Sequence, residues 1–238
     1  MEWSGEGLII GVRKHGESGV IVELMTPDRG RHLGLVRGGR SRKQAATLQP
    51  GNTVEVTWRA RLEDHLGNFT IELVKGRAAD LIGDRLRLYG VQLLCDHLRL
   101  LPERDPHQLL LFQAMVVVEG DMEAIEMGEA LARFELALLE ELGFGLDIYA
   151  CAVTGAITGL THISPKSGRA VTAEIAAPYL EKLLPLPAFL LNDSRPDPHD
   201  LAAAFRLTGY FLDAHIWSAR NISVPAMRER LIEALVSL

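Results

Sequence analysis

The chain has 238 residues, with 25 lysines and arginines against 31 aspartates and glutamates and a formal net charge of -6. Its hydrophobic fraction of 47% and charged fraction of 24% exclude global disorder and are typical of a protein that buries a core. No run approaches the ~20 apolar residues of a membrane span, and the acidic start is unlike a secretory signal. Two cysteines, Cys95 and Cys151, are too few for a disulfide framework or a four-cysteine zinc site. We therefore expect a cytoplasmic protein without membrane contact.

Charge is divided unevenly along the chain. Residues 1–80 hold 12 basic and 10 acidic side chains, whereas residues 81–238 hold 13 and 21. Within the first part, residues 29–43 contain six cations and no acid. A local basic stretch in an acidic protein indicates a polyanionic partner, and the alternative is a solvated surface loop.

Residues 6–75 are predicted to be β-structure. The predicted strands are short and separated by polar turns, and they cover residues 8–12, 20–24, 31–36, 53–59 and 69–73. The polar stretch 38–51 is predicted to be a loop. Five short strands in about 70 residues favour a small closed barrel such as the OB-fold, with an SH3-like barrel as the alternative.

The fourth predicted strand has the clearest period. Val54, Val56 and Trp58 alternate with polar residues, so they are predicted to share one face of the strand. This phase favours Trp58 as part of the barrel core over Trp58 as an exposed ring on which bases stack.

After residue 80 the pattern becomes helical. The predicted helical segments are 86–101, 107–118, 127–142, 173–184, 198–219 and 226–237. Three glycines and Pro165 interrupt this pattern between residues 151 and 172. The predicted fold is therefore α+β, with a five-stranded OB-fold barrel at residues 1–80 and an all-helical domain at 81–238. The helical domain carries a small irregular insert at about 150–172.

No catalytic motif is present. The sequence has no G-x-S-x-G, no P-loop and no H-E-x-x-H. His15, Glu17 and Ser18 have catalytic side chains, but neighbours in one hairpin turn cannot form a nucleophile, base and orienting group. The acidic residues between 119 and 141 have no histidine beside them, which favours a solvated helix face over a metal site. We therefore predict a protein that is not an enzyme and has no cofactor.

The candidate nucleic-acid contacts are cations in the predicted barrel. Residues 37–43 combine four cations with two glycines, so they can follow a phosphate backbone while arginines bind its oxygens in pairs. Arg59 and Arg61 are predicted to extend this track from the solvent face of the fourth strand. The predicted binding residues are Arg13, Lys14, Arg29, Arg31, Arg37, Arg40, Arg42, Lys43, Arg59 and Arg61.

These features, taken in order, resemble the RecO family of DNA repair proteins. In the first part, the resemblance rests on the Gly-Glu hairpin, the Thr-x-x-x-Gly turn at 26–30, the basic Gly/Arg/Ser loop and the Leu-Gln-Pro at 48–50. In the second part, it rests on Phe134-Glu135, Leu142-Gly143, Gly145, Cys151, Gly155, Ser164-Pro165 and Gly168. The resemblance covers most of the chain.

The resemblance implies an OB-fold that binds single- and double-stranded DNA through its basic residues. It also implies a helical domain with a zinc-ribbon-like insert, strand annealing, and partnership with RecR and the single-strand-binding protein (SSB) in loading RecA. The expected location is then the nucleoid within the cytoplasm. An OB-fold module that binds RNA and a non-catalytic interaction scaffold remain alternatives from the residues alone.

The insert departs from the family pattern. Many members have a CxxC…CxxC zinc site there, but this chain keeps only Cys151, with Thr154, Thr172 and Ile175 at the other likely ligand positions. A single thiolate cannot hold a tetrahedral zinc ion. We therefore expect a degenerate zinc-ribbon-like insert that is held by packing and binds no metal.

The resemblance also implies a receptor for the SSB tail, which is acidic and ends in a hydrophobic residue. The predicted core stripe of the helix at 198–219 contains Leu201, Phe205, Thr208, Leu212 and Ile216. A second stripe with Arg206, Tyr210 and Trp217, continued by Arg220, combines aromatic rings with arginines, as binding hot spots do. These four residues are the predicted tail-binding site. The alternative is that Tyr210 and Trp217 pack against a neighbouring helix.

Overall fold

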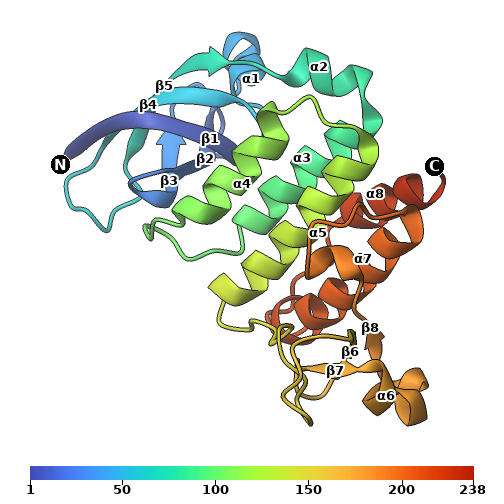
Figure 1. Cartoon of the computed structure of the whole chain (residues 1–238). Coiled ribbons are helices and arrows are strands. Elements are labelled where there is room, and N and C mark those ends of the chain that lie inside the picture. The colour runs from blue at the N-terminus through green and yellow to red at the C-terminus, as the bar shows by residue number, and fades with distance from the viewer. The chain divides into compact units, whose positions relative to one another are not determined.

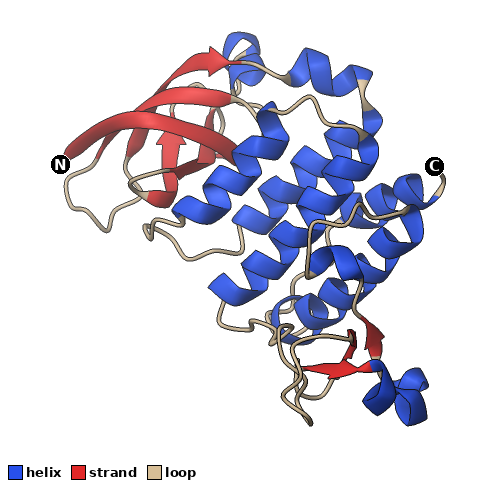
Figure 2. Cartoon of the chain, viewed as in Figure 1, coloured by secondary structure: helices blue, strands red, loops and turns tan.

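The structure is a computed structural model that describes all residues, 1–238 (Figure 1). The chain divides into two compact units, Met1–Gly120 and Asp121–Leu238. The predicted change from strands to helices near residue 80 falls inside the first unit, because three helices pack there with the barrel (Figure 2). None of the helices is both long and apolar enough to span a membrane.

Five strands close into the OB-type barrel of the first unit. They are β1 (Glu2–His15), β2 (Gly19–Thr26), β3 (Gly30–Val36), β4 (Thr53–Arg59) and β5 (Asn68–Lys75). Their order around the barrel is β1-β2-β3-β5-β4, and β1 pairs with β4 through its first half and with β2 through its second. The closing contact between β3 and β5 is parallel, at Leu35 and Asn68. The predicted five-stranded barrel is therefore confirmed.

Apolar side chains at every second position of the strands fill the barrel. Val54, Val56 and Trp58 are all at most 1% exposed, and Phe69 and Ile71 of β5 pack with them in the same cluster. The prediction that Trp58 lies in the core is confirmed. Trp58 also donates a hydrogen bond from Nε1 to the carbonyl of Leu66 at 3.0 Å, so its one polar atom is satisfied inside the barrel.

The stretch predicted to be a loop at 38–51 contains a short helix, α1 (Arg42–Thr47), so that prediction was incomplete. Ser41 caps its first turn by accepting a hydrogen bond from the Gln44 amide at 3.4 Å. None of its residues is buried, which leaves no apolar period in the sequence to signal a helix. Its carbonyl end is held instead by the buried side chain of Asn52, whose Nδ2 donates to the carbonyls of Ala46 and Thr47 at 3.2 and 2.9 Å.

Three further helices complete the first unit: α2 (Ala78–Gly83), α3 (Arg85–Leu98) and α4 (Gln108–Glu119). Cys95 lies buried in α3. Arg77, just before α2, is 2% exposed, and its amide donates to Asn52 Oδ1 at 2.8 Å. Its guanidinium donates to the Gly51 carbonyl, to Thr53 Oγ1 and to Glu119 Oε1 at 2.8–2.9 Å. Asn52 and Arg77 thus join α1, β4 and α4 through buried polar contacts.

The second unit is a helical domain with one small sheet. Its helices are α5 (Ala124–Glu141), α6 (Ala173–Ala176), α7 (Pro198–Leu212) and α8 (Ala226–Val236), with 3-10 turns at Ala177–Lys182 and Ala188–Leu190. The core stripe predicted for the helix at 198–219 is confirmed, since all five of its residues are buried. The first four lie on α7, and Ile216 lies just beyond its end. A π-helical turn, Asp213–Trp217, continues α7 where the sequence predicts an uninterrupted α-helix.

A buried ion pair lies between α5, α7 and α8. Arg228 donates to both carboxylate oxygens of Glu135 at 2.8 and 2.9 Å, and Glu135 is completely buried. Thr208 of α7 also donates its hydroxyl to Glu135. Because a buried carboxylate needs all of its hydrogen bonds, these contacts fix how the three helices pack.

The insert forms a three-stranded sheet in the order β7-β6-β8, from β6 (Leu160–Ile163), β7 (Ala170–Thr172) and β8 (Leu184–Pro185). It therefore extends beyond the predicted end at residue 172. The segment at 173–184, predicted to be one helix, is instead the short α6 and a 3-10 turn that lead into β8. A two-residue strand that includes a proline gives no periodic signal, so the sequence could not indicate it.

Cys151 lies at the turn that opens the insert. Gly155 makes this turn with a φ of 71° and donates its amide to the Cys151 carbonyl at 2.9 Å. Hydrogen bonds from the Thr154 hydroxyl and from the amides of Thr154, Val153 and Thr172 lower the pKa of the Cys151 thiol to about 6. The chain contains no group of three or more His, Cys, Asp or Glu side chains placed to hold a metal ion.

Replacement of Asn52 tests the polar contacts around α1. We expect Asn52→Ala to lower the free energy of unfolding by about 1–3 kcal/mol, because it leaves the buried Arg77 amide without its acceptor. Gln49→Ala is the matched control, since Gln49 also donates to an α1 carbonyl but is exposed. Urea unfolding measures both. Equal stability of the two variants would contradict the role given to Asn52.

The lowered pKa of the Cys151 thiol predicts that the stability of the fold depends on pH. Its pKa is about 6 in the folded chain and 9 in the absence of these contacts, so between these values the unfolded chain binds more protons. The contribution of the thiolate is therefore full above pH 9 and is lost as the pH falls through 6. We expect the stability of the wild type relative to Cys151→Ser to rise with pH across this window in reduced samples. A difference that stays constant with pH would refute the lowered pKa.

Candidate nucleic-acid interface

The cations around α1 form the candidate interface, and we call them the α1 cations: Arg37, Arg40, Arg42 and Lys43. All four are exposed. The Arg40 amide donates to the Ser18 carbonyl at 3.2 Å, and its guanidinium donates to the Glu17 carbonyl at 2.6 Å. These bonds tie the segment before α1 to the turn between β1 and β2, so the cations are presented by a braced segment rather than a free loop.

Two clefts of about 430 Å³ each are lined by residues of α1 and by predicted cations. The first is lined by Arg37, Arg59 and Gln44, together with residues 68–71 of β5. The second is lined by Lys14 and Arg40, together with Leu48 and its neighbours. Cations that lie 22 and 26 residues apart in the sequence are thus brought together at α1. Each cleft offers guanidinium or ammonium groups beside a shallow hollow, which suits a phosphate backbone.

The other predicted cations lie at the ends of strands. Arg13 is exposed near the end of β1, and Arg29 is exposed in the turn between β2 and β3. Arg61 is exposed but lies beyond the end of β4, in the segment that leads to β5, rather than on the strand face. Arg59 is exposed on β4 and forms an ion pair with Glu2 at 2.8 Å, which a phosphate would have to replace or share.

Arg31 differs from the other predicted binding residues. Its side chain is 16% exposed and donates to the buried carboxylate of Glu23 at 2.9 Å and to Glu103 at 3.3 Å. Arg99 also contacts Glu23, at 3.4 Å. Withdrawing Arg31 would leave the buried Glu23 with fewer partners, so its guanidinium serves the packing of the first unit. We leave Arg31 out of the interface.

Sequence reasoning missed the neutral residues of the first cleft. Gln44, Asn68 and Thr70 line it beside Arg37 and Arg59. Amide and hydroxyl groups often position a phosphate backbone without carrying charge. A charge pattern cannot reveal them, because it records only cations.

The predicted tail-binding residues are not all on the surface. Arg206 and Arg220 are exposed, and Tyr210 is 45% exposed, but Trp217 is only 2% exposed. The Arg228 guanidinium lies 5.5 Å from the centre of the Trp217 ring. The surface stripe predicted for this helix is therefore corrected at Trp217: the π-helical turn adds a residue to the helical repeat and turns this ring into the core.

The comparisons with known proteins agree with this architecture. The family descriptions "Recombination protein O N terminal" and "Recombination protein O C terminal" match residues 1–77 and 82–221. The DNA repair protein RecO of Sinorhizobium medicae is 52% identical over 235 residues, which cover 98% of this chain and 94% of the relative. The protein of the same name from Brucella abortus is 51% identical over 238 residues, which cover 99% and 96%. The chain belongs to the RecO family.

Proposed function

We propose that this chain is a DNA-binding mediator of recombination and repair. It binds single- and double-stranded DNA, anneals complementary strands and, with RecR, helps to load RecA onto strands that SSB covers. It acts without catalysis and without a cofactor, at the nucleoid in the cytoplasm. Its relatives are named DNA repair proteins, which supports the pathway.

The observation that carries the proposal is the braced cationic surface at α1. Phosphate contacts from arginine and lysine supply most of the affinity of a protein that does not read sequence. When cations on one surface neutralise the phosphates of two strands, the strands repel each other less, which favours annealing. The proposed contacts are the α1 cations with Arg13, Lys14, Arg29, Arg59 and Arg61.

Two other functions remain as alternatives. An RNA-binding module would use the same cations, and an interaction scaffold would not need them. Binding to matched DNA and RNA oligonucleotides distinguishes the first alternative from the proposal. A wild type that binds neither nucleic acid would favour the second alternative, the interaction scaffold. The family membership favours DNA.

Replacing the four α1 cations by alanine tests the interface. We expect the affinity for DNA to fall and its dependence on salt to flatten, because each lost phosphate contact removes about 0.9 from the slope of log K against log salt on duplex DNA and about 0.7 on single strands. Fluorescence anisotropy at several salt concentrations gives both quantities.

A charge-matched variant serves as the control for this experiment. Lys166, Lys182, Arg195 and Arg230 are exposed in the second unit, and their replacement removes the same charge without touching the interface. We expect this variant to bind like the wild type. If the folded α1 variant keeps the affinity and slope of the control, α1 is not the DNA-binding surface.

We also propose that Arg206, Tyr210 and Arg220 bind the SSB tail. Arg206 and Tyr210 are exposed one turn apart on α7, and Arg220 is exposed after the π-helical turn that follows this helix. Two arginines and a tyrosine of this kind fit an acidic peptide that ends in a hydrophobic residue. We expect an SSB tail peptide to bind the wild type. Arg206→Ala and Arg220→Ala should each weaken it about 10- to 100-fold, the range for a lost hydrogen bond to a charged group.

Fluorescence polarisation with a labelled peptide measures this binding, with Arg230→Ala on α8 as the control. Binding by both folded arginine variants at wild-type affinity would rule out this site, and so would a wild type that does not bind the peptide.

A further inference from the structure

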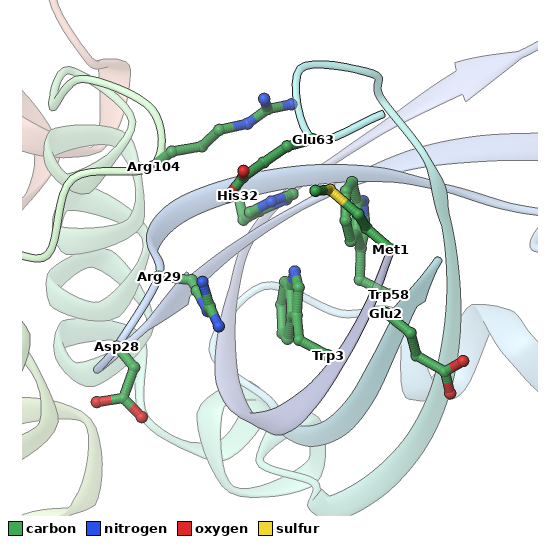
Figure 3. Close-up of a pocket in the computed structure, with 9 residues that line it drawn as sticks. All are labelled: Met1, Glu2, Trp3, Asp28, Arg29, His32, Trp58, Glu63 and Arg104. Atoms are coloured by element: carbon green, nitrogen blue, oxygen red, sulfur yellow. The ribbon is translucent and has the colours of Figure 1, made fainter. Parts of the chain in front are cut away.

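A separate cavity of about 340 Å³ opens at the end of the barrel where β1 begins and β4 ends (Figure 3). Its volume lies within the range of small-molecule sites. Three aromatic residues, Trp3, His32 and Trp58, line it together with the cations Arg29 and Arg104. We call it the Trp3 pocket. Neither the sequence patterns nor the α1 surface accounts for it.

The aromatic rings of the Trp3 pocket are braced against one another. The Trp3 and His32 ring centres are 5.1 Å apart at an interplanar angle of 67°, and Trp58 stacks on Trp3 at 6.2 Å and 22°. His32 and Trp58 are nearly completely buried, whereas Trp3 is only partly buried. The pocket therefore has a rigid aromatic wall, and part of the Trp3 ring is available to a ligand.

Arg104 reaches the pocket through an unusual backbone. Its φ of 63° lies in the left-handed region, which few non-glycine residues adopt. Its amide donates to the Arg31 carbonyl at 2.8 Å, and its guanidinium donates to the His65 carbonyl at 3.0 Å. Gly30 lets the backbone of Arg104 and Asp105 lie this close to β3, because a Cβ at residue 30 would lie 1.9 Å from the Asp105 carbonyl oxygen. The cation of Arg104 is therefore held at the pocket by a backbone conformation that arginine disfavours.

The acidic residues around the pocket leave its cations available. Glu2 forms an ion pair with Arg59, and Figure 3 shows the carboxylates of Glu2 and Asp28 directed away from the Trp3 ring. Glu63, which also lines the pocket, can accept a hydrogen bond from the amino group of a base. Burial lowers the pKa of His32 below its ordinary value, and the charges of Arg104 and Arg29 lower it further, against the hydrogen bond to the Leu33 carbonyl, which raises it.

The pocket adjoins the first cleft of the α1 surface. Arg59 lines that cleft and Glu2 lines the pocket, and their side chains are joined by the 2.8 Å ion pair. Phe69 also lines the cleft, and its ring lies 6.2 Å from that of Trp3. A strand bound in the cleft would therefore have the pocket beside it.

We propose that the Trp3 pocket takes one unpaired base of a DNA strand, which stacks on Trp3 while Arg29 and Arg104 bind the neighbouring phosphate. This inference rests on the proposed DNA-binding function and adds a site for the base itself. Aromatic rings and guanidinium groups are the two chemistries that proteins use to bind single strands. A base paired within a duplex cannot enter, so the pocket selects single strands.

The test compares two single-stranded oligonucleotides of about 16 nucleotides, the upper end of an OB-fold site, one with all bases and one made of abasic sites. We expect Trp3→Ala to weaken binding of the normal strand about 5- to 150-fold, the range for one base–aromatic stack. It should bind the abasic strand as the wild type does. Trp3→Phe keeps a ring and should retain most of the affinity.

Arg104→Gly gives a second test that does not disturb the barrel core, since glycine accepts the positive φ. Arg104→Gly should weaken binding of the single strand and reduce the slope of log K against log salt by about 0.7. Arg230→Ala on α8 should change neither quantity. Circular dichroism and thermal unfolding confirm that each variant is folded.

Three results would overturn the inference: equal effects of Trp3→Ala on both strands, no effect of Trp3→Ala on either strand, or Arg104→Gly behaving like Arg230→Ala. If the α1 variant loses its affinity for DNA while the Trp3 and Arg104 variants keep theirs, the inference about the pocket is wrong and the proposed function stands. If the wild type binds no DNA at low salt, both fail.

Discussion

The hydrogen bonds of Asn52 hold the candidate interface in place. Asn52 is 1% exposed, and its two side-chain groups face different elements: Nδ2 donates to the last carbonyls of α1, and Oδ1 accepts from the Arg77 amide. Its backbone carbonyl accepts from Ile9 of β1 at 2.9 Å. Since α1 buries no side chain of its own, apolar packing cannot position it, and this polar contact has to.

Neighbouring residues extend this constraint through the first unit. Gly51 has a φ of 90°, and a Cβ there would lie 2.9 Å from Val91 of α3, so only glycine lets the chain pass this close. Arg77 then joins the Gly51 carbonyl to Glu119 at the end of α4. The cations of α1 are therefore supported by helices that the sequence assigns to a different domain. A surface on the barrel depends on packing well beyond residue 80.

The sequence predicted the parts of the fold that rest on side-chain period and missed those that rest on local polar contacts. Val54, Val56 and Trp58 alternate because one face of β4 is buried, so their place in the barrel could be predicted. The helix α1 has no buried face, and β8 has two residues, so neither produces a period. Trp217 was placed by an α-helical repeat that the π-helical turn interrupts. A repeat read along the sequence cannot register that extra residue.

The candidate site shows the same limit for charge. Arg31 and Arg37 look alike in the sequence, yet Arg31 neutralises the buried Glu23 while Arg37 lines an open cleft. Partners far along the chain decide which arginine is available, such as Glu103 for Arg31 and Glu2 for Arg59. The net charge of -6 is equally uninformative about the interface, because salt screens charges beyond roughly 8–10 Å. In the function that we propose, the cations at α1 and the aromatic rings of the Trp3 pocket would divide the recognition of DNA. The cations would hold phosphates of any strand, whereas the rings could contact only a base that has left its partner. A surface built this way would retain single strands after it has gathered both forms.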